Sequence, residues 1–86
     1  MTQKEKIIRY LMKHKKGMTN GDGMRILMIN CPHKRIAELT SEWGIKIERD
    51  YVPDPYHKGH TLTRYRLLDK KQKALKEYLD SLRRSA

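Results

Sequence analysis

The spacing of apolar residues changes abruptly at Gly44. Before this glycine, Ile36, Leu39 and Trp43 recur at the three- and four-residue spacing of an amphipathic helix. After it, isoleucine alternates with Lys and Glu, which is the period of a half-buried strand. A helix followed at once by a strand restricts a chain of 86 residues to a small mixed α+β fold with a single core.

Capping signals and apolar periodicity predict the remaining elements. Thr2 and Glu5 have the spacing of a capping box, and an apolar helical stripe follows them. Pro32 suits the first turn of the helix that ends at Gly44, because its missing amide hydrogen costs nothing there. We expect helices over residues 3–16, 24–28, 32–43 and from 69 onward, and strands from residue 45 and over 62–67, joined by an irregular loop over 52–60.

The second of these helices is weakly specified. Residues 24–28 supply a short apolar stretch that must end before Pro32. Gly21 and Gly23 would each cost about 1 kcal/mol inside a helix. They therefore lie in its first turn, or the helix starts after them.

The order of the elements is helix, helix, helix, strand, loop, strand, helix. A short helix that precedes a second helix and a β-hairpin is the layout of a winged helix-turn-helix module. We therefore expect an α+β fold in which residues 1–68 form a winged helix-turn-helix domain of three helices and a β-hairpin wing. Residues 69–86 would add a C-terminal helix.

The charge balance favours a polyanionic partner. Lys and Arg number 20 against 10 Asp and Glu, which leaves a formal net charge of +10. Each phosphate that such a protein neutralises releases counterions, so nucleic acid is the leading candidate, although solvated basic helix faces also keep small proteins soluble. Together with the helix-turn-helix layout, the charge favours double-stranded DNA. The apolar runs are too short to span a membrane, and the lone Cys31 cannot form an internal disulfide, so we expect a cytoplasmic protein without membrane contact.

Several short motifs carry a family resemblance. The sequence Arg-Ile-Ala-Glu-Leu at residues 35–39, followed by Gly44, Ile45 and Ile47 and then by Arg-Tyr-Arg-Leu at 64–67, resembles a family of short helix-turn-helix proteins common in bacteriophages and other mobile elements. The family places a recognition helix where residues 31–43 lie here. The resemblance implies DNA binding in transcription control or in phage integration and excision, and hence a protein associated with the bacterial nucleoid.

Candidate DNA contacts in the 32–43 helix follow from a helical wheel centred on Ile36. Its opposite, polar side would meet the base edges or the phosphates, unless it is an ordinary solvated helix face. The candidates are Asn30, Lys34 and Ser41 for base edges or phosphates, Ala37 for a thymine methyl, Glu38 for cytosine N4, and His33 and Arg35 for phosphates.

A second group of candidates lies in the expected wing. Lys58 and the turn-forming Gly59 suit a wing tip that enters the minor groove or follows the backbone, with Arg64 nearby. The alternative is a loop that stays disordered without DNA.

Neither metal binding nor catalysis is indicated. A structural zinc site usually shows paired Cys or Cys and His ligands at short spacing, and one Cys with four scattered His residues does not meet that pattern. The sequence also lacks a phosphate-binding glycine loop and a nucleophile motif. We therefore expect a protein that is not an enzyme and takes no cofactor, metal or small-molecule substrate.

The partners remain open in two respects. The apolar stripe of the C-terminal helix could pack inside the chain or form a homodimer through Leu75, Tyr78, Leu79 and Leu82. A different function on the same scaffold is also open, namely a small interaction module or inhibitor that binds an acidic host protein. RNA binding has less support, because the aromatic residues form no obvious stacking platform.

Overall fold

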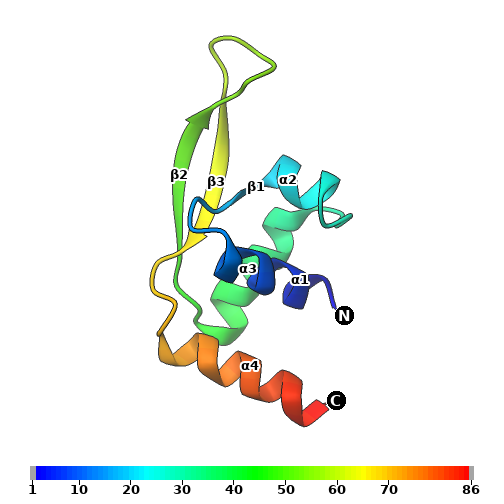
Figure 1. The fold of residues 1–86 in the computed structure, drawn as a ribbon, viewed down its shortest axis with the longest axis vertical. Helices are drawn as coiled ribbons and strands as arrows, with labels where there is room; N and C mark the ends of the chain where they lie inside the picture. The colour runs from blue at the N-terminus through cyan, green and yellow to red at the C-terminus, as the bar shows by residue number, and fades with distance from the viewer. Residues whose placement is uncertain (1, 86) are drawn as a thin grey trace.

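The structure is a computed structural model that describes residues 2–85. Within this range it is a small α+β fold of four helices and one three-stranded antiparallel sheet, as expected (Figure 1). In chain order the elements are α1 (Gln3–Lys13), β1 (Met18–Thr19), α2 (Asn20–Arg25), α3 (Pro32–Trp43), β2 (Ile47–Pro53), β3 (Thr61–Leu67) and α4 (Lys73–Ser85).

Helix α1 is shorter than its periodicity suggests. It is capped by Thr2, whose hydroxyl accepts a hydrogen bond from the Glu5 amide at 3.2 Å, but it ends at Lys13 and not at residue 16. The chain must turn there to reach the sheet, and Gly17 makes the turn with a φ of +86°. A Cβ at Gly17 would lie 2.3 Å from the Tyr65 carbonyl oxygen, so the close approach to β3 requires glycine.

Strand β1 was not expected, because residues 18–23 have the composition of a turn. Met18 pairs with Tyr65 and Thr19 with Arg64, so the sheet order is β1-β3-β2. Two residues are too few to show an alternating pattern, and only the pairing with β3 defines the strand. This places β3 at the centre of the sheet.

Helix α2 contains the two glycines and excludes most of the apolar stretch. Thr19 and Asp22 form a reciprocal capping box at 3.1 Å in each direction, so the helix starts at Asn20 with Gly21 and Gly23 in its first turns. The two glycines thus lie inside the helix, which was one of the two alternatives, but the helix ends at Arg25, so its expected extent to residue 28 is wrong.

The residues after α2 turn out of helical geometry. Met28 and Cys31 both have positive φ angles, of 58° and 50°. In this segment Ile29 is buried, whereas Met24, Ile26 and Met28 expose 50%, 56% and 80% of their surface. The apolar stretch thus supplies only part of the core and leaves a small apolar surface before α3.

Helix α3 and the hairpin largely follow the sequence pattern. Helix α3 starts at Pro32 and ends at Gly44, which adopts a left-handed φ of +70° as a C-cap. The hairpin is longer than expected, because β2 continues to Pro53, opposite Thr61. Since β2 is an edge strand, the proline there removes no ladder hydrogen bond.

The core lies among α1, α3 and the sheet, to which Met18 of β1 and Tyr65 of β3 contribute. Helix α4 packs on it through Leu75 and Tyr78, and Tyr78 meets the edge of Trp43 at 5.0 Å between ring centroids. Burial raises the pKa of Tyr78. The buried apolar residues are Ile7, Ile8, Leu11, Met18, Ile29, Ile36, Leu39, Ile45, Tyr65, Leu75 and Tyr78.

The apolar stripe of α4 packs against the core of its own chain. Leu75 and Tyr78 are 1% and 4% exposed, and Leu79 and Leu82 are partly buried against the same core. A homodimer through these four residues would have to separate them from the core, so the structure favours the intramolecular alternative.

No helix of the described residues is long and apolar enough to cross a membrane.

Candidate nucleic-acid interface

One side of α3 is exposed to solvent. Ile36 and Leu39 are buried, as the helical wheel predicted, Pro32 is buried as well, and α1 lies along a second side. The remaining side is called the free face below. It consists of His33, Lys34, Ala37, Thr40 and Ser41, all of which are exposed.

The free face contains several of the candidate residues and one residue that was not among them. Lys34, Ala37 and Ser41 lie on it as expected, and Asn30 is exposed just before the helix. Thr40 was not among the candidates, because the wheel places it near the apolar side. It is exposed because α1 covers the other flank of α3.

Asn20 fixes the start of α3 against α2. Its side-chain oxygen accepts a hydrogen bond from the backbone amide of His33 at 3.1 Å and lies 3.3 Å from Nδ1 of the His33 ring. No sequence signal singled out Asn20 beyond its position after a capping threonine. The contact sets the angle at which the free face is presented.

Two candidate residues of α3 point toward α1 instead. Glu38 lies 2.9 Å from Lys4 and 3.1 Å from Arg35, and Lys4 also reaches Glu42 at 3.1 Å. The hydrogen bond from Lys4, with Arg35 adding its charge, lowers the pKa of Glu38. Glu38 and Arg35 therefore belong to an ion-pair cluster between α1 and α3, which corrects their expected place on the DNA side.

Arg64 also has a different place from the one expected. It lies directly opposite Asp50 across the hairpin and makes two hydrogen bonds to its carboxylate, the one from Nε at 3.0 Å. Beside it, Arg66 lies 3.2 Å from Glu48. Arg64 thus joins β2 to β3 on the sheet face that alternates away from the buried Tyr65.

This pair makes a testable contribution to acid stability. The hydrogen bonds from Arg64 lower the pKa of Asp50, so the pair stabilises the fold above the ordinary carboxyl pKa and its contribution is lost as the pH falls through the lowered value. We expect Asp50→Asn to lower the Tm at neutral pH and to reduce the further fall in Tm between about pH 5 and pH 2. Thermal unfolding followed by circular dichroism measures both, with Glu77→Gln as an exposed control. Equal acid sensitivity of Asp50→Asn and the native chain would contradict this role.

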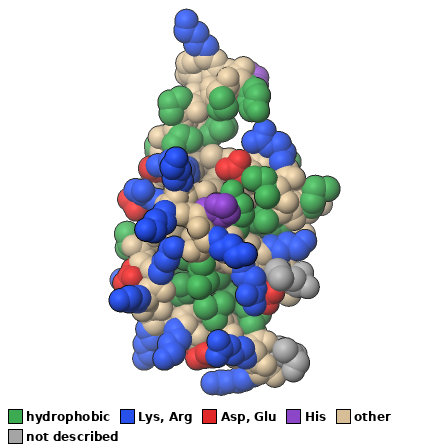
Figure 2. Space-filling view, viewed as in Figure 1, with side chains coloured by type: hydrophobic (Ala, Val, Ile, Leu, Met, Phe, Trp, Pro, Cys, Tyr) green, Lys and Arg blue, Asp and Glu red, His purple; other side chains and the backbone are tan. Residues whose placement is uncertain are grey.

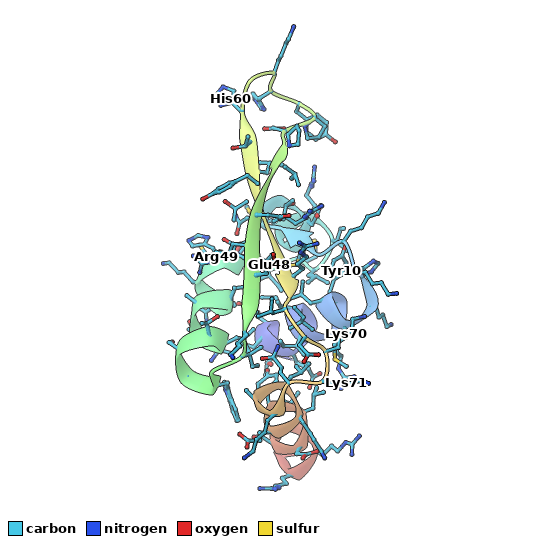
Figure 3. All side chains as sticks on the ribbon, turned by 90° about the vertical axis from the view of Figure 1, so that its left-hand side faces the viewer. Tyr10, Glu48, Arg49, His60, Lys70 and Lys71 are labelled. Carbon is cyan, nitrogen blue, oxygen red and sulfur yellow. The ribbon has the colours of Figure 1, made fainter. Side chains whose placement is uncertain are left out.

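Arg49 is a candidate that sequence reasoning passed over. It pairs with Tyr65 in the β2–β3 register, and its guanidinium lies 5.6 Å from the Tyr65 ring centroid. Figure 3 shows Arg49 on the side of the sheet where α3 lies. Strict alternation from Ile47 would have placed Arg49 and the 75% exposed Tyr51 on this face.

The wing, defined as β2, β3 and the loop between them, extends well beyond the helices (Figure 1). Its loop is held by local hydrogen bonds from the Asp54 amide to the His60 carbonyl and from the Tyr56 amide to the Asp54 carboxylate, both at 2.9 Å. The Tyr56 amide bond is the main cause of the lowered pKa of Asp54. Gly59 turns the chain with a φ of +85°, and Lys58 beside it is exposed, as a wing tip requires.

The wing also contacts α2. The guanidinium of Arg25 lies 5.9 Å from the ring centroid of Tyr56. This contact connects the wing to α2, the helix that carries Asn20.

Among the described residues, no group of three or more His, Cys, Asp or Glu side chains is placed to hold a metal ion.

Comparison of the chain with protein-family models, with curated proteins and with solved structures finds no match. The functional assignment therefore depends on the chain's own residues and their geometry.

Proposed function

We propose that this chain is a winged helix-turn-helix protein that binds double-stranded DNA, with α3 in the major groove and the wing on the backbone or in the minor groove. One observation carries the proposal: both carboxylates of α3, Glu38 and Glu42, bind Lys4. Helix α3 therefore presents only basic, hydroxyl and small side chains on its free face. Such a face suits a phosphate-lined groove, which would repel a free carboxylate.

The free face supplies the contacts that base readout needs. Lys34 can donate to guanine O6 or N7 or to a phosphate, Thr40 and Ser41 can exchange hydrogen bonds with base edges, and Ala37 can meet a thymine methyl. Arg49 flanks this face from β2 and is placed to reach a phosphate. A role in transcription control or in excision and DNA architecture fits equally well with this arrangement.

The wing would contribute affinity for DNA that does not depend on the sequence. Lys58 is exposed at its tip, where no carboxylate of the described residues lies within ion-pair distance of it. A lysine on the backbone adds affinity for every sequence alike and steepens the salt dependence. The wing therefore adds affinity, and the free face of α3 adds discrimination.

The test is binding to a pool of random duplexes across a salt series, with sequencing of the retained DNA. We expect enrichment of a motif and log affinity that falls linearly with log salt concentration. Lys58→Ala should weaken binding to all sequences equally and reduce the slope of log affinity against log salt concentration by about one unit. Lys73→Ala is the control for the loss of one surface charge, and strong salt-dependent binding without any enriched motif would restrict the function to DNA architecture.

A second function has one observation in its favour. Met24, Ile26 and Met28 form an exposed apolar surface beside the start of α3, which DNA binding does not require. An interaction module that binds an acidic host protein would use it together with the basic charge. A duplex Kd weaker than about 10⁻⁴ M at physiological salt, below ordinary non-specific binding, would favour this alternative over DNA.

A further inference from the structure

A second group of free cations lies away from α3. Lys13, Lys15 and Lys16 occupy the end of α1 and the turn after it, and Lys70 and Lys71 occupy the loop between β3 and α4. These five residues are called the second basic face below. All five are exposed, and within the described part of the chain no carboxylate lies within ion-pair distance of any of them.

The tertiary structure brings the two halves of this face together. The ammonium group of Lys70 donates a hydrogen bond to the main-chain carbonyl of Met12, which lies 58 positions earlier in the chain. This contact satisfies a carbonyl in the last turn of α1 and fixes the loop beside it. The cluster therefore has a defined shape, and it is not a run of lysines along one flexible segment.

A hollow of about 430 Å³ lies next to this face. His14, Lys15, Arg66 and Lys70 line it, and Glu48, which pairs with Arg66, is its only carboxylate. Phosphate groups suit such a hollow, because cations converge on it from the turn after α1, from β3 and from the loop that follows β3.

The second basic face and the free face of α3 lie on different sides of the molecule. In Figure 3, Lys70 and Lys71 lie on the α1 side of the sheet, whereas Arg49 and α3 lie on the other. Figure 2, which is viewed from the α1 side, shows Lys and Arg side chains spread widely over that surface. The chain measures 45 × 23 × 22 Å, and in Figure 3 Arg49 and the two labelled lysines lie to opposite sides of its long axis.

We propose that the second basic face binds the phosphate backbone of a second duplex segment, so that one chain bridges two duplexes. This inference rests on the proposed function of the free face. A straight duplex seated on α3 cannot reach lysines on the far side of the domain, and charge complementarity selects a polyanion for them. Backbone contacts alone carry no sequence information, so the second segment is bound irrespective of its sequence.

The test uses the full chain and two short duplexes, one fixed to beads and one carrying a fluorophore. The native chain is expected to retain the labelled duplex on the beads at moderate salt. The triple variant Lys15→Glu, Lys16→Glu and Lys71→Glu should lose at least about 90% of this capture, while its affinity for a single duplex falls much less. Analytical ultracentrifugation without DNA verifies that each protein is monomeric, so that capture is not due to self-association.

The matched control reverses three exposed charges on α4, Lys73, Lys76 and Arg84, and so changes the net charge by the same amount. It should keep most of the capture, and circular dichroism verifies that both variants fold. Equal losses in the two variants would overturn the proposal, as would unchanged capture in the first variant. Loss of binding to anionic vesicles without loss of duplex capture would overturn it in favour of a membrane surface.

The two proposals fail in distinguishable ways. If the native chain binds a single duplex but captures no second one, the bridging inference is wrong and the proposed function stands. If it binds no duplex at all, both are wrong.

Discussion

Reversing the charges of Lys34 and Arg49 together is expected to weaken binding to a short duplex by about 100-fold or more at physiological salt. Lys34 lies on the free face in the first turn of α3, and Arg49 flanks this face from β2. Each Glu replaces an attraction to phosphate or base edges with a repulsion. Fluorescence anisotropy with a duplex selected from the random pool measures the change.

The control for this prediction is the pair Lys73→Glu and Lys76→Glu on α4. It alters the net charge equally but lies outside the proposed contact surface, so we expect a reduction of less than about tenfold. The single variants separate the two roles. Lys34→Ala should weaken binding to the selected duplex more than binding to a random one, and Arg49→Ala should weaken binding to both equally. Equal losses in the Lys34, Arg49 pair and the α4 pair would argue against a specific site.

Replacing Gly23 with alanine is expected to lower the free energy of unfolding by about 1–3 kcal/mol. A Cβ at Gly23 would lie 2.7 and 2.9 Å from two ring carbons of Pro32, at the crossing of α2 and α3. One helix must move to relieve the overlap, and Pro32 begins the helix that carries the free face. The same variant should therefore also weaken DNA binding.

Gly21→Ala is the matched control, two positions earlier in the same short helix. Its Cβ would meet nothing closer than 3.7 Å, and alanine has the higher helix propensity, so stability should rise by up to about 1 kcal/mol. Urea unfolding of both variants measures the difference. A Gly23→Ala variant as stable as Gly21→Ala would show that α2 and α3 do not need their close approach.

The best-predicted parts of the fold are those specified by local chemistry. Helix α3 begins at Pro32 and ends at Gly44, as expected, because a proline in the first turn and a glycine C-cap act within a few residues of each other. The alternation in residues 62–67 likewise marked β3. The candidates Lys34, Ala37 and Ser41 proved exposed because helical periodicity defines an outer face, and Lys58 and Gly59 because they lie in a turn.

The errors arose where distant segments meet. Met18 and Thr19 form a strand only because β3 lies beside them, and α1 ends early so that Gly17 can approach Tyr65. The apolar stretch after α2 was taken for a helix, but its residues turn through positive φ angles to reach α3. No local pattern reports these contacts.

The sequence by itself determined the α+β class, the basic character of the surface and the limits of α3, because these depend on composition, periodicity and capping within short windows. Only the tertiary structure decided which charges remain free. Lys4 forms ion pairs with both carboxylates of α3, which lie at least 34 positions later in the chain. Asp50 forms an ion pair with Arg64, 14 positions away. An ion pair requires two side chains to meet within a few ångströms, and that distance is set by packing, not by spacing along the chain.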